Sequence, residues 1–204
     1  MSEQPAPTSD FARVALDLMT FPVGARFRRI DFTRHANPLG FGKTPSRFGD
    51  PRRRKPENCF GVLYVGETLK VCFLEAVLRD KRNGSVGDYP LEETELRARR
   101  FTLVEIHAPL TVVDLRRDGG VRMGVPSDVS RASDQRLARR WSVAFHEHPA
   151  TPDGVAYESR LNGQTNLAIY DRAVPKLRVA ATMPLLAAPE LPEVLDELLA
   201  ALVS

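Results

Sequence analysis

Three residues in one short stretch of the chain have side chains that packing alone would not require. Arg47 follows a Gly- and Pro-rich segment, Tyr64 lies in an apolar run, and Glu75 lies in the next apolar segment. A guanidinium forms paired hydrogen bonds with phosphate or carboxylate groups. An aromatic ring can hold a cationic group against its face, and a carboxylate stabilises positive charge that develops at a reacting centre. Together the three could bind an anionic ligand, stack a ring and polarise a bond.

The residues around this trio predict a loop, a strand and a helix. Residues 62–65 are short, β-prone and bounded by glycines, as is typical of a buried strand. Residues 69–79 are apolar on nearly every side, which predicts a helix inside the core. Glu75 and Arg79 stand four residues apart, so an ordinary ion pair on this helix is an alternative explanation of Glu75. A carboxylate among apolar neighbours needs a partner or a role, because burying its charge unpaired is costly.

The rest of the pattern predicts an α+β domain with six or seven short strands and three or four helices. We expect residues 1–9 to be disordered and residues 10–204 to form a single domain. We expect further strands at 27–32, 101–107, 110–115, 155–160, 165–170 and 176–181, and further helices at 10–19, 133–148 and 191–203. The last helix would pack on the sheet or on a second copy of the chain, which leaves a homo-oligomer open.

Composition limits the kinds of partner. The net charge of +3 and the pI near 9.1 agree with an anionic ligand but do not demand nucleic acid. The basic run at 50–58 has no interleaved aromatic residues, so we expect no direct nucleic-acid binding. No apolar run approaches the roughly 18 residues of a membrane helix, and the N-terminus lacks an apolar signal core. We therefore expect a cytoplasmic protein that does not bind membranes.

Several common chemistries lack their motifs. His146 and His148 are two residues apart, so they would not share a helix face, and we expect no metal site. No G-x-S-x-G elbow is present, and Ser159 falls inside an expected strand, so nothing in the spacing favours a serine hydrolase. Cys59 and Cys72 have no CxxC spacing, and Cys72 should be a buried thiol. A nucleotide would not be held by a P-loop or a Rossmann motif, because both are absent.

What remains is a cleft built from the edges of strands and helices. Arg29, Arg47, Ser159 and Arg160 could meet an anion, Tyr64 could stack on a ring, and Glu75 could act at a reacting centre. Cleavage of the bond between nicotinamide and ribose in NAD would use such a set. The pyrophosphate needs guanidinium or hydroxyl donors, the cationic nicotinamide suits an aromatic face, and the oxocarbenium-like transition state favours a carboxylate.

At these residues the sequence resembles the RES-domain family, the toxin half of bacterial RES–Xre toxin–antitoxin modules. The resemblance covers roughly residues 27 to 180, and the order and spacing of its motifs are more specific than any one of them. The motifs are Arg29-Ile30, Asn37-Pro38-Leu39-Gly40, Ser46-Arg47-Phe48, Gly61-Val62-Leu63-Tyr64, Glu75, Asp153-Gly154-Val155, Tyr157-Glu158-Ser159-Arg160 and Gly163-Gln164-Thr165-Asn166-Leu167.

The resemblance implies an ADP-ribosyltransferase-like α+β fold of short, mostly antiparallel strands that acts on NAD as substrate. It implies degradation of NAD by hydrolysis or phosphorolysis, or transfer of ADP-ribose to a protein target. By the same resemblance, Arg47 would hold the dinucleotide, Tyr64 would stack on nicotinamide, and Glu75 would assist the glycosidic break. Ser159 would contact phosphate. A small helical, Xre-like antitoxin would be the partner.

One departure from the family pattern and two alternatives accompany the resemblance. The segment Pro51–Asn58 is longer and more basic than the family pattern. Arg29 would line the pocket from the first strand, and Arg28 would replace it if that strand presents its other face. The alternative function is a non-catalytic module of the same fold that binds a partner through the basic loop and the last helix.

Overall fold

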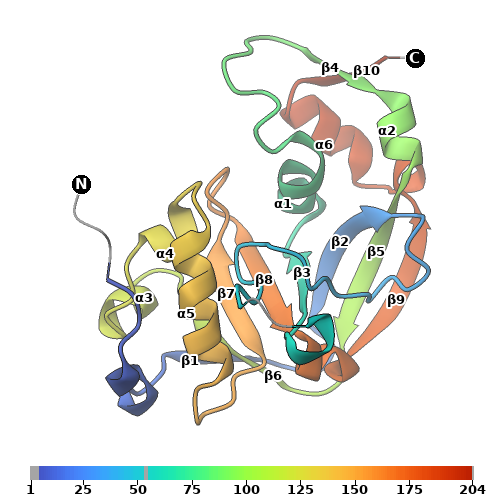
Figure 1. Ribbon diagram of the computed structural model, residues 1–204. Coiled ribbons are helices and arrows are strands. Elements are labelled where there is room, and N and C mark those ends of the chain that lie inside the picture. The colour runs from blue at the N-terminus through green and yellow to red at the C-terminus, as the bar shows by residue number, and fades with distance from the viewer. Residues whose placement is uncertain (1–4, 53–54, 204) are drawn as a thin grey trace.

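The computed structural model describes residues 5–52 and 55–203, and a large sheet lies at its centre (Figure 1). The expectation of disorder at residues 1–9 falls partly outside these residues, since 1–4 are not described. The strands of the described chain are β1 (Leu18–Phe21), β2 (Arg26–Phe32), β3 (Val62–Gly66), β4 (Tyr89–Glu92), β5 (Arg99–Ile106), β6 (Leu110–Asp114), β7 (Gly154–Glu158), β8 (Thr165–Tyr170), β9 (Leu177–Pro184) and β10 (Ala200–Val203).

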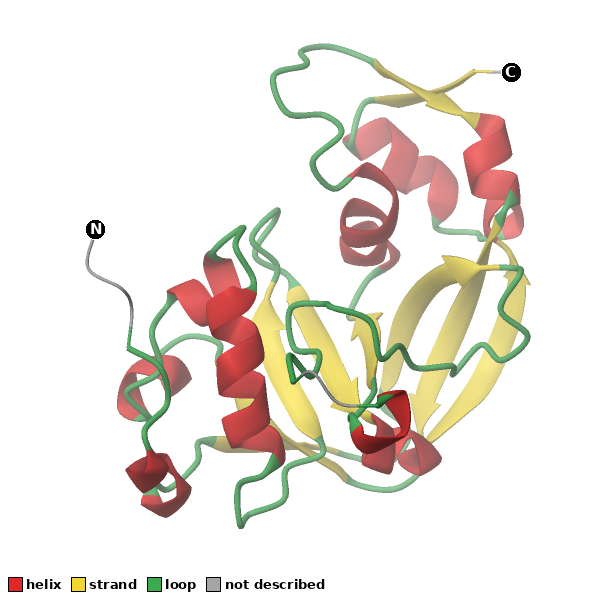
Figure 2. Cartoon of the chain, in the orientation of Figure 1, coloured by secondary structure: helices red, strands yellow, loops and turns green. Residues whose placement is uncertain are grey.

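Helical segments connect and cover these strands (Figure 2). The α-helices are α1 (Leu69–Phe73), α2 (Glu93–Arg97), α3 (Gly119–Arg122), α4 (Asp128–Arg131), α5 (Arg136–His146) and α6 (Leu191–Glu197). The 3₁₀ helices are η1 (Ser9–Arg13), η2 (Pro56–Asn58), η4 (Asp171–Lys176) and η5 (Leu185–Ala187), and η3 (Leu74–Leu78) is a π-helical turn that continues α1. Thr68 caps α1 by accepting a hydrogen bond from the amide of Val71.

Eight strands form the main sheet in the order β1-β6-β7-β8-β3-β2-β5-β9, and β10 pairs with β4 in a small second sheet. Within the main sheet only β6 and β7 run parallel, so the expectation of mostly antiparallel strands is confirmed. The strands of this sheet are least paired between β3 and β2. Between β2 and β3 a single residue pair, Arg28 with Gly66, is in ladder register, whereas β2 and β5 are paired along the whole of β2.

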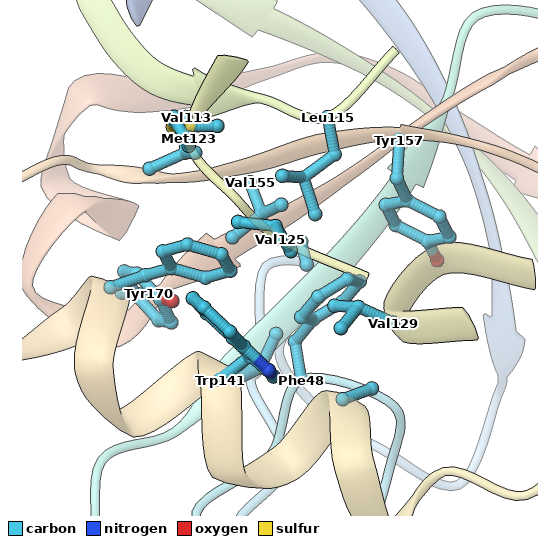
Figure 3. Packing of buried hydrophobic residues seen from close by; sticks show 14 of the residues in the cluster. Phe48, Val113, Leu115, Met123, Val125, Val129, Trp141, Val155, Tyr157 and Tyr170 are labelled. Carbon is cyan, nitrogen blue, oxygen red and sulfur yellow. The ribbon is translucent and has the colours of Figure 1, made fainter. Parts of the chain in front are cut away.

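Buried apolar side chains of the described residues gather in three clusters. The first lies between α5 and the β7–β8–β3 part of the sheet and includes Phe48, Trp141 and Tyr170 (Figure 3). The second joins α1 and α6 to β2 and β5, and the third fills the opposite face of the sheet. Because the first two clusters cover different halves of the sheet, the gap between β2 and β3 lies where the two halves meet.

Most of the predicted elements are present. The strands expected at 27–32, 62–65, 101–107, 110–115 and 165–170 correspond to β2, β3, β5, β6 and β8. The buried helix expected at 69–79 is α1 with η3, and Cys72 is a buried free thiol. Burial raises the pKa of Cys72 to about 12. The helix expected from 133 is α5, which begins at Arg136.

Several predictions were wrong. Residues 10–19 do not form one helix: η1 ends at Arg13, and the chain then extends into β1, which pairs with β6. The helix expected at 191–203 ends at Glu197, because Leu199 adopts a left-handed backbone (φ 48°) and β10 follows. The strand expected at 155–160 ends at Glu158, so Ser159 lies beyond it. The described chain also has more strands and helices than the six or seven and the three or four expected.

Within residues 5–52 and 55–203, no helix combines the length and the apolar character that a membrane crossing requires.

The contact between β3 and α1 generates a stability prediction. A Cβ atom on Gly66 would lie 2.5 Å from Val71 Cγ1 and 2.8 Å from Cys72 Sγ. We therefore expect Gly66→Ala to push α1 away from the sheet and lower the free energy of unfolding by about 1–3 kcal/mol. Urea denaturation measures this change. Gly42→Ala is the matched control, since its Cβ would meet Thr44 Oγ1 at an ordinary 3.6 Å. Equal stability of the two variants would contradict the packing described.

Candidate functional site

A cavity of about 260 Å³ opens where β2 and β3 separate. Its walls come from both strands, the loop before β3, the α1–η3 segment, β7 and β8. The lining residues are Arg29, Ile30, Pro45, Ser46, Arg47, Tyr64, Val65, Gly66, Cys72, Glu75, Ala76, Arg79, Gln135, Tyr157 and Asn166. Arg47, Tyr64 and Glu75, which come from three different elements, therefore meet in one cavity.

Tyr64 is held by its hydroxyl group. Its Oη donates a hydrogen bond to Ser46 Oγ (3.0 Å) and accepts one from the backbone amide of Phe48 (2.9 Å). Burial raises the pKa of Tyr64, so the phenol stays neutral. Because both hydrogen bonds tie the hydroxyl to the 46–48 loop, the ring is fixed and its face is what remains for a ligand.

Arg47 is a buried cation without a carboxylate partner among the described residues. Arg47 as a whole residue is 9% exposed. Within the described part of the chain its side chain forms one hydrogen bond, from Nη1 to the carbonyl of Val129 in α4 at 3.4 Å. Burial lowers the pKa of Arg47, while the nearby Tyr157 and Glu75 oppose that shift. A guanidinium is still charged at neutral pH. Desolvating it without an acid is costly, which suits a site that an anionic ligand completes.

Glu75 lies in the π-helical turn η3 rather than in regular α-helix, and such turns occur often at functional sites. Its Oε1 accepts a hydrogen bond from Ser159 Oγ at 2.7 Å, and Ser159 Oγ in turn accepts one from the amide of Leu161 at 3.2 Å. Ser159 is almost fully buried. The partner of Glu75 is therefore Ser159, and the i,i+4 ion pair with Arg79 does not form.

A second contact joins the same two segments. Arg160, next to Ser159, forms an ion pair with Asp80, which follows η3 by two residues. Arg79, which lies between η3 and Asp80, has a left-handed backbone (φ 37°), and this redirects the chain immediately after the turn that carries Glu75. Thus Ser159 and Arg160 hold the Glu75 segment against the end of β7. Neither Ser159 nor Arg160 lines the cavity itself.

The two arginines of β2 have protein partners. Arg29 lines the cavity, but its guanidinium donates to the carbonyls of Tyr64 (3.1 Å) and Gly40 (2.9 Å). Its Nε is buried without a partner, and burial lowers its pKa. Arg28 points away from the cavity lining and pairs with Glu190 at the start of α6 (3.3 Å), and it also donates to the carbonyl of Glu67.

Three cavity residues were missed as individual site candidates. Tyr157 and Asn166 face each other in the ladder between β7 and β8, and each is 5% exposed. Ser46 fixes the Tyr64 hydroxyl. Tyr157 and Asn166 alternate with apolar residues like ordinary strand positions. Apart from their place in the family motifs, their signal in the sequence is a polar group on the buried face of a strand.

Among residues 5–52 and 55–203 there is no group of three or more His, Cys, Asp or Glu side chains arranged to hold a metal ion.

Comparison with known proteins identifies the class to which this fold and cavity belong. The RES-domain family model matches residues 24–192, which is most of the chain, and the protein is a member of that family. A curated relative, "Probable toxin y4kH" of Sinorhizobium fredii, is 45% identical over 109 residues, covering 53% of this chain and 86% of the relative. The crystal structure of the M. tuberculosis MbcT–MbcA toxin–antitoxin complex contains a chain of similar fold. That match has a TM-score of 0.59 at 16% identity and covers 80% of this chain and 85% of the other.

The contrast between Arg47 and Arg100 gives a prediction about Arg47. We expect Arg47→Met to change the free energy of unfolding by no more than about 1 kcal/mol, because the cation it removes has no acid partner. Arg100→Met is the matched comparison. Arg100 forms two hydrogen bonds with the carboxylate of Asp31, whose side chain is 7% exposed. Arg100→Met would leave that buried carboxylate without a partner and lower the free energy of unfolding by about 3 kcal/mol or more.

Chemical denaturation of the two variants beside the parent protein measures both values. A large loss for Arg47→Met would show that Arg47 stabilises the free protein and is not reserved for a ligand.

Proposed function

We propose that this protein is the toxin of a toxin–antitoxin module and that it cleaves the nicotinamide–ribose bond of NAD. Membership of the RES-domain family supports the toxin assignment, as do the names of the relative in S. fredii and of the M. tuberculosis complex. The observation that carries the reaction is the meeting of Arg47, Tyr64 and Glu75 in one cavity.

The cavity suits the chemical groups of NAD. Arg47 offers guanidinium donors that no described carboxylate occupies, and these fit the pyrophosphate. The fixed ring of Tyr64 offers a face to the cationic nicotinamide. A volume of about 260 Å³ is at the small end for a ligand pocket, so nicotinamide and its ribose would be enclosed and the adenosine would extend from the opening.

Glu75 would act on the ribose. As nicotinamide departs, positive charge develops between C1′ and the ring oxygen of the ribose, and a carboxylate beside it lowers the energy of that transition state. Ser159 binds Oε1 of Glu75 and leaves Oε2 without a partner among the described residues. Ser159 therefore positions the carboxylate so that Oε2 can face the sugar. Nicotinamide leaves as a neutral molecule, and the C1′ cation is captured by water, phosphate or a protein side chain.

The wider assignments follow from the same proposal. Residues 10–204 would form one RES domain with an ADP-ribosyltransferase-like fold, acting in the cytoplasm. The partner would be a small helical antitoxin of the Xre type that keeps the toxin inactive, and a protein that accepts ADP-ribose would be a second partner if transfer is the reaction. NAD is the substrate, and no metal takes part.

Glu75→Gln tests the reaction. The substitution keeps volume and a hydrogen-bond acceptor for Ser159 but removes the negative charge, so we expect nicotinamide release from NAD to fall by about 100-fold or more while the fold is retained. Chromatography of free nicotinamide over time measures the rate. Glu193→Gln on the exposed face of α6 is the control and should react at the parent rate.

Two outcomes would contradict the proposal: NAD that stays intact, with no protein labelled, when mixed with the parent protein, and full turnover by Glu75→Gln. Mass analysis of the products, with and without phosphate and cell lysate, identifies the acceptor. Free ADP-ribose, a phosphorylated ADP-ribose and a modified protein have different masses.

A further inference from the structure

Asn166 is a buried amide that the protein does not satisfy. It lies in β8, lines the cavity and is 5% exposed, yet its Nδ2 has no hydrogen-bond partner among the described residues. A primary amide carries two N–H donors and a carbonyl acceptor, and each of these needs a partner when the group is buried. Native structures leave few buried polar groups unpaired, and each one requires an explanation.

Packing does not supply that explanation. The same face of β8 continues with Ala168 and Tyr170, which belong to the apolar cluster under α5. An apolar side chain would suit the position of Asn166 equally well, and it would avoid the cost of burying an unpaired amide. On the neighbouring strand Gly66 lies opposite Asn166 and has no side chain that could pair with the amide. The amide of Asn166 is therefore better explained by ligand binding than by packing.

The position of Asn166 selects the part of the ligand that it would meet. Its ladder partners are Tyr157 on β7 and Gly66 on β3, and both Asn166 Oδ1 and Cys72 Sγ border the space above Gly66. Cys72 lies three residues before Glu75 on the α1–η3 segment, and Tyr157, Asn166 and Glu75 line the same cavity. Asn166 thus borders the end of the cavity where Glu75 would face the ribose. The group attached to that ribose in the proposed substrate is nicotinamide, whose carboxamide carries an acceptor and two donors, the complement of the Asn side chain.

We propose that Asn166 recognises the carboxamide of nicotinamide, with each amide donating a hydrogen bond to the carbonyl oxygen of the other. This inference rests on the proposed function, because it takes NAD as the ligand. It adds a specificity-determining residue to the site: the cavity would distinguish a nicotinamide ring from the same ring bearing a carboxylate, which offers no donor to Asn166.

Binding of two mononucleotides tests the inference, because neither contains adenine and any contact of Asn166 with adenine is therefore excluded. The probes are nicotinamide mononucleotide and nicotinic acid mononucleotide, titrated calorimetrically into Glu75→Gln protein, which would not cleave them. We expect tighter binding of the amide than of the acid. Adding Asn166→Leu should weaken binding of the amide by about tenfold and bring the preference for amide over acid close to one. Asn166→Ala repeats the test with a smaller side chain.

The stability of the variants separates recognition from a structural role. Asn166→Leu should unfold at the same or a higher urea concentration than the parent, because the amide it removes has no partner in the protein. Asn58→Ala, which changes an exposed amide outside the cavity, is the control and should leave both affinities unchanged.

Each result has a definite meaning. Equal weakening of both nucleotides, no weakening of either, or a preference that survives Asn166→Leu would overturn the inference. Weaker binding of NAD with unchanged binding of nicotinamide mononucleotide would also overturn it, since Asn166 would then contact adenine. If the parent protein binds nicotinamide mononucleotide selectively but leaves NAD intact, the role of Asn166 in recognising the carboxamide is supported and the proposed reaction is overturned.

Discussion

The guanidinium of Arg29 joins the two halves of the sheet at the point where their hydrogen-bonded ladder stops. β2 and β3 share a single pair in register, and beyond it the Arg29 side chain donates to the carbonyl of Tyr64. Cys72 Sγ makes a similar bridge from α1 to the carbonyl of Arg28 (3.0 Å). Side chains thus replace backbone pairing where the strands separate, and the separation provides the volume of the cavity. A fully paired sheet would have no room for a ligand between β2 and β3.

The gap between β2 and β3 also determines how Glu75 must be oriented. The carboxylate comes from a helix packed over the gap, and the helix changes to a π-helical turn where Glu75 must face inward. Its orientation then depends on contacts from a distant part of the chain. Ser159 binds the carboxylate, and the ion pair of Arg160 with Asp80 fixes the end of the turn. In this arrangement Ser159 and Arg160 hold the segment that carries the carboxylate, whereas Arg47 has no carboxylate partner among the described residues.

Local patterns were enough to predict the elements that carry Tyr64 and Glu75, because a short apolar strand bounded by glycines and an almost wholly apolar helix each have a distinctive composition. Long-range pairing was not predictable in this way. The bond between Ser159 and Glu75 spans 84 residues, and nothing near either residue encodes it. Residues 191–203 keep an apolar helical stripe throughout, yet Leu199 turns the backbone and the end pairs with β4, so tertiary contacts overrode the local pattern. The roles assigned to the site residues rest on a family resemblance, and the geometry favours a positioning role for Ser159.

The most direct test of the account is a crystal structure of the Glu75→Gln variant soaked with NAD. The account predicts the nicotinamide ring against the face of Tyr64, the first ribose beside residue 75, and the pyrophosphate within hydrogen-bonding distance of Arg47. Electron density for NAD at any other place on the protein would contradict it. So would a dinucleotide bound in the cavity in the reverse direction, with adenine against Tyr64.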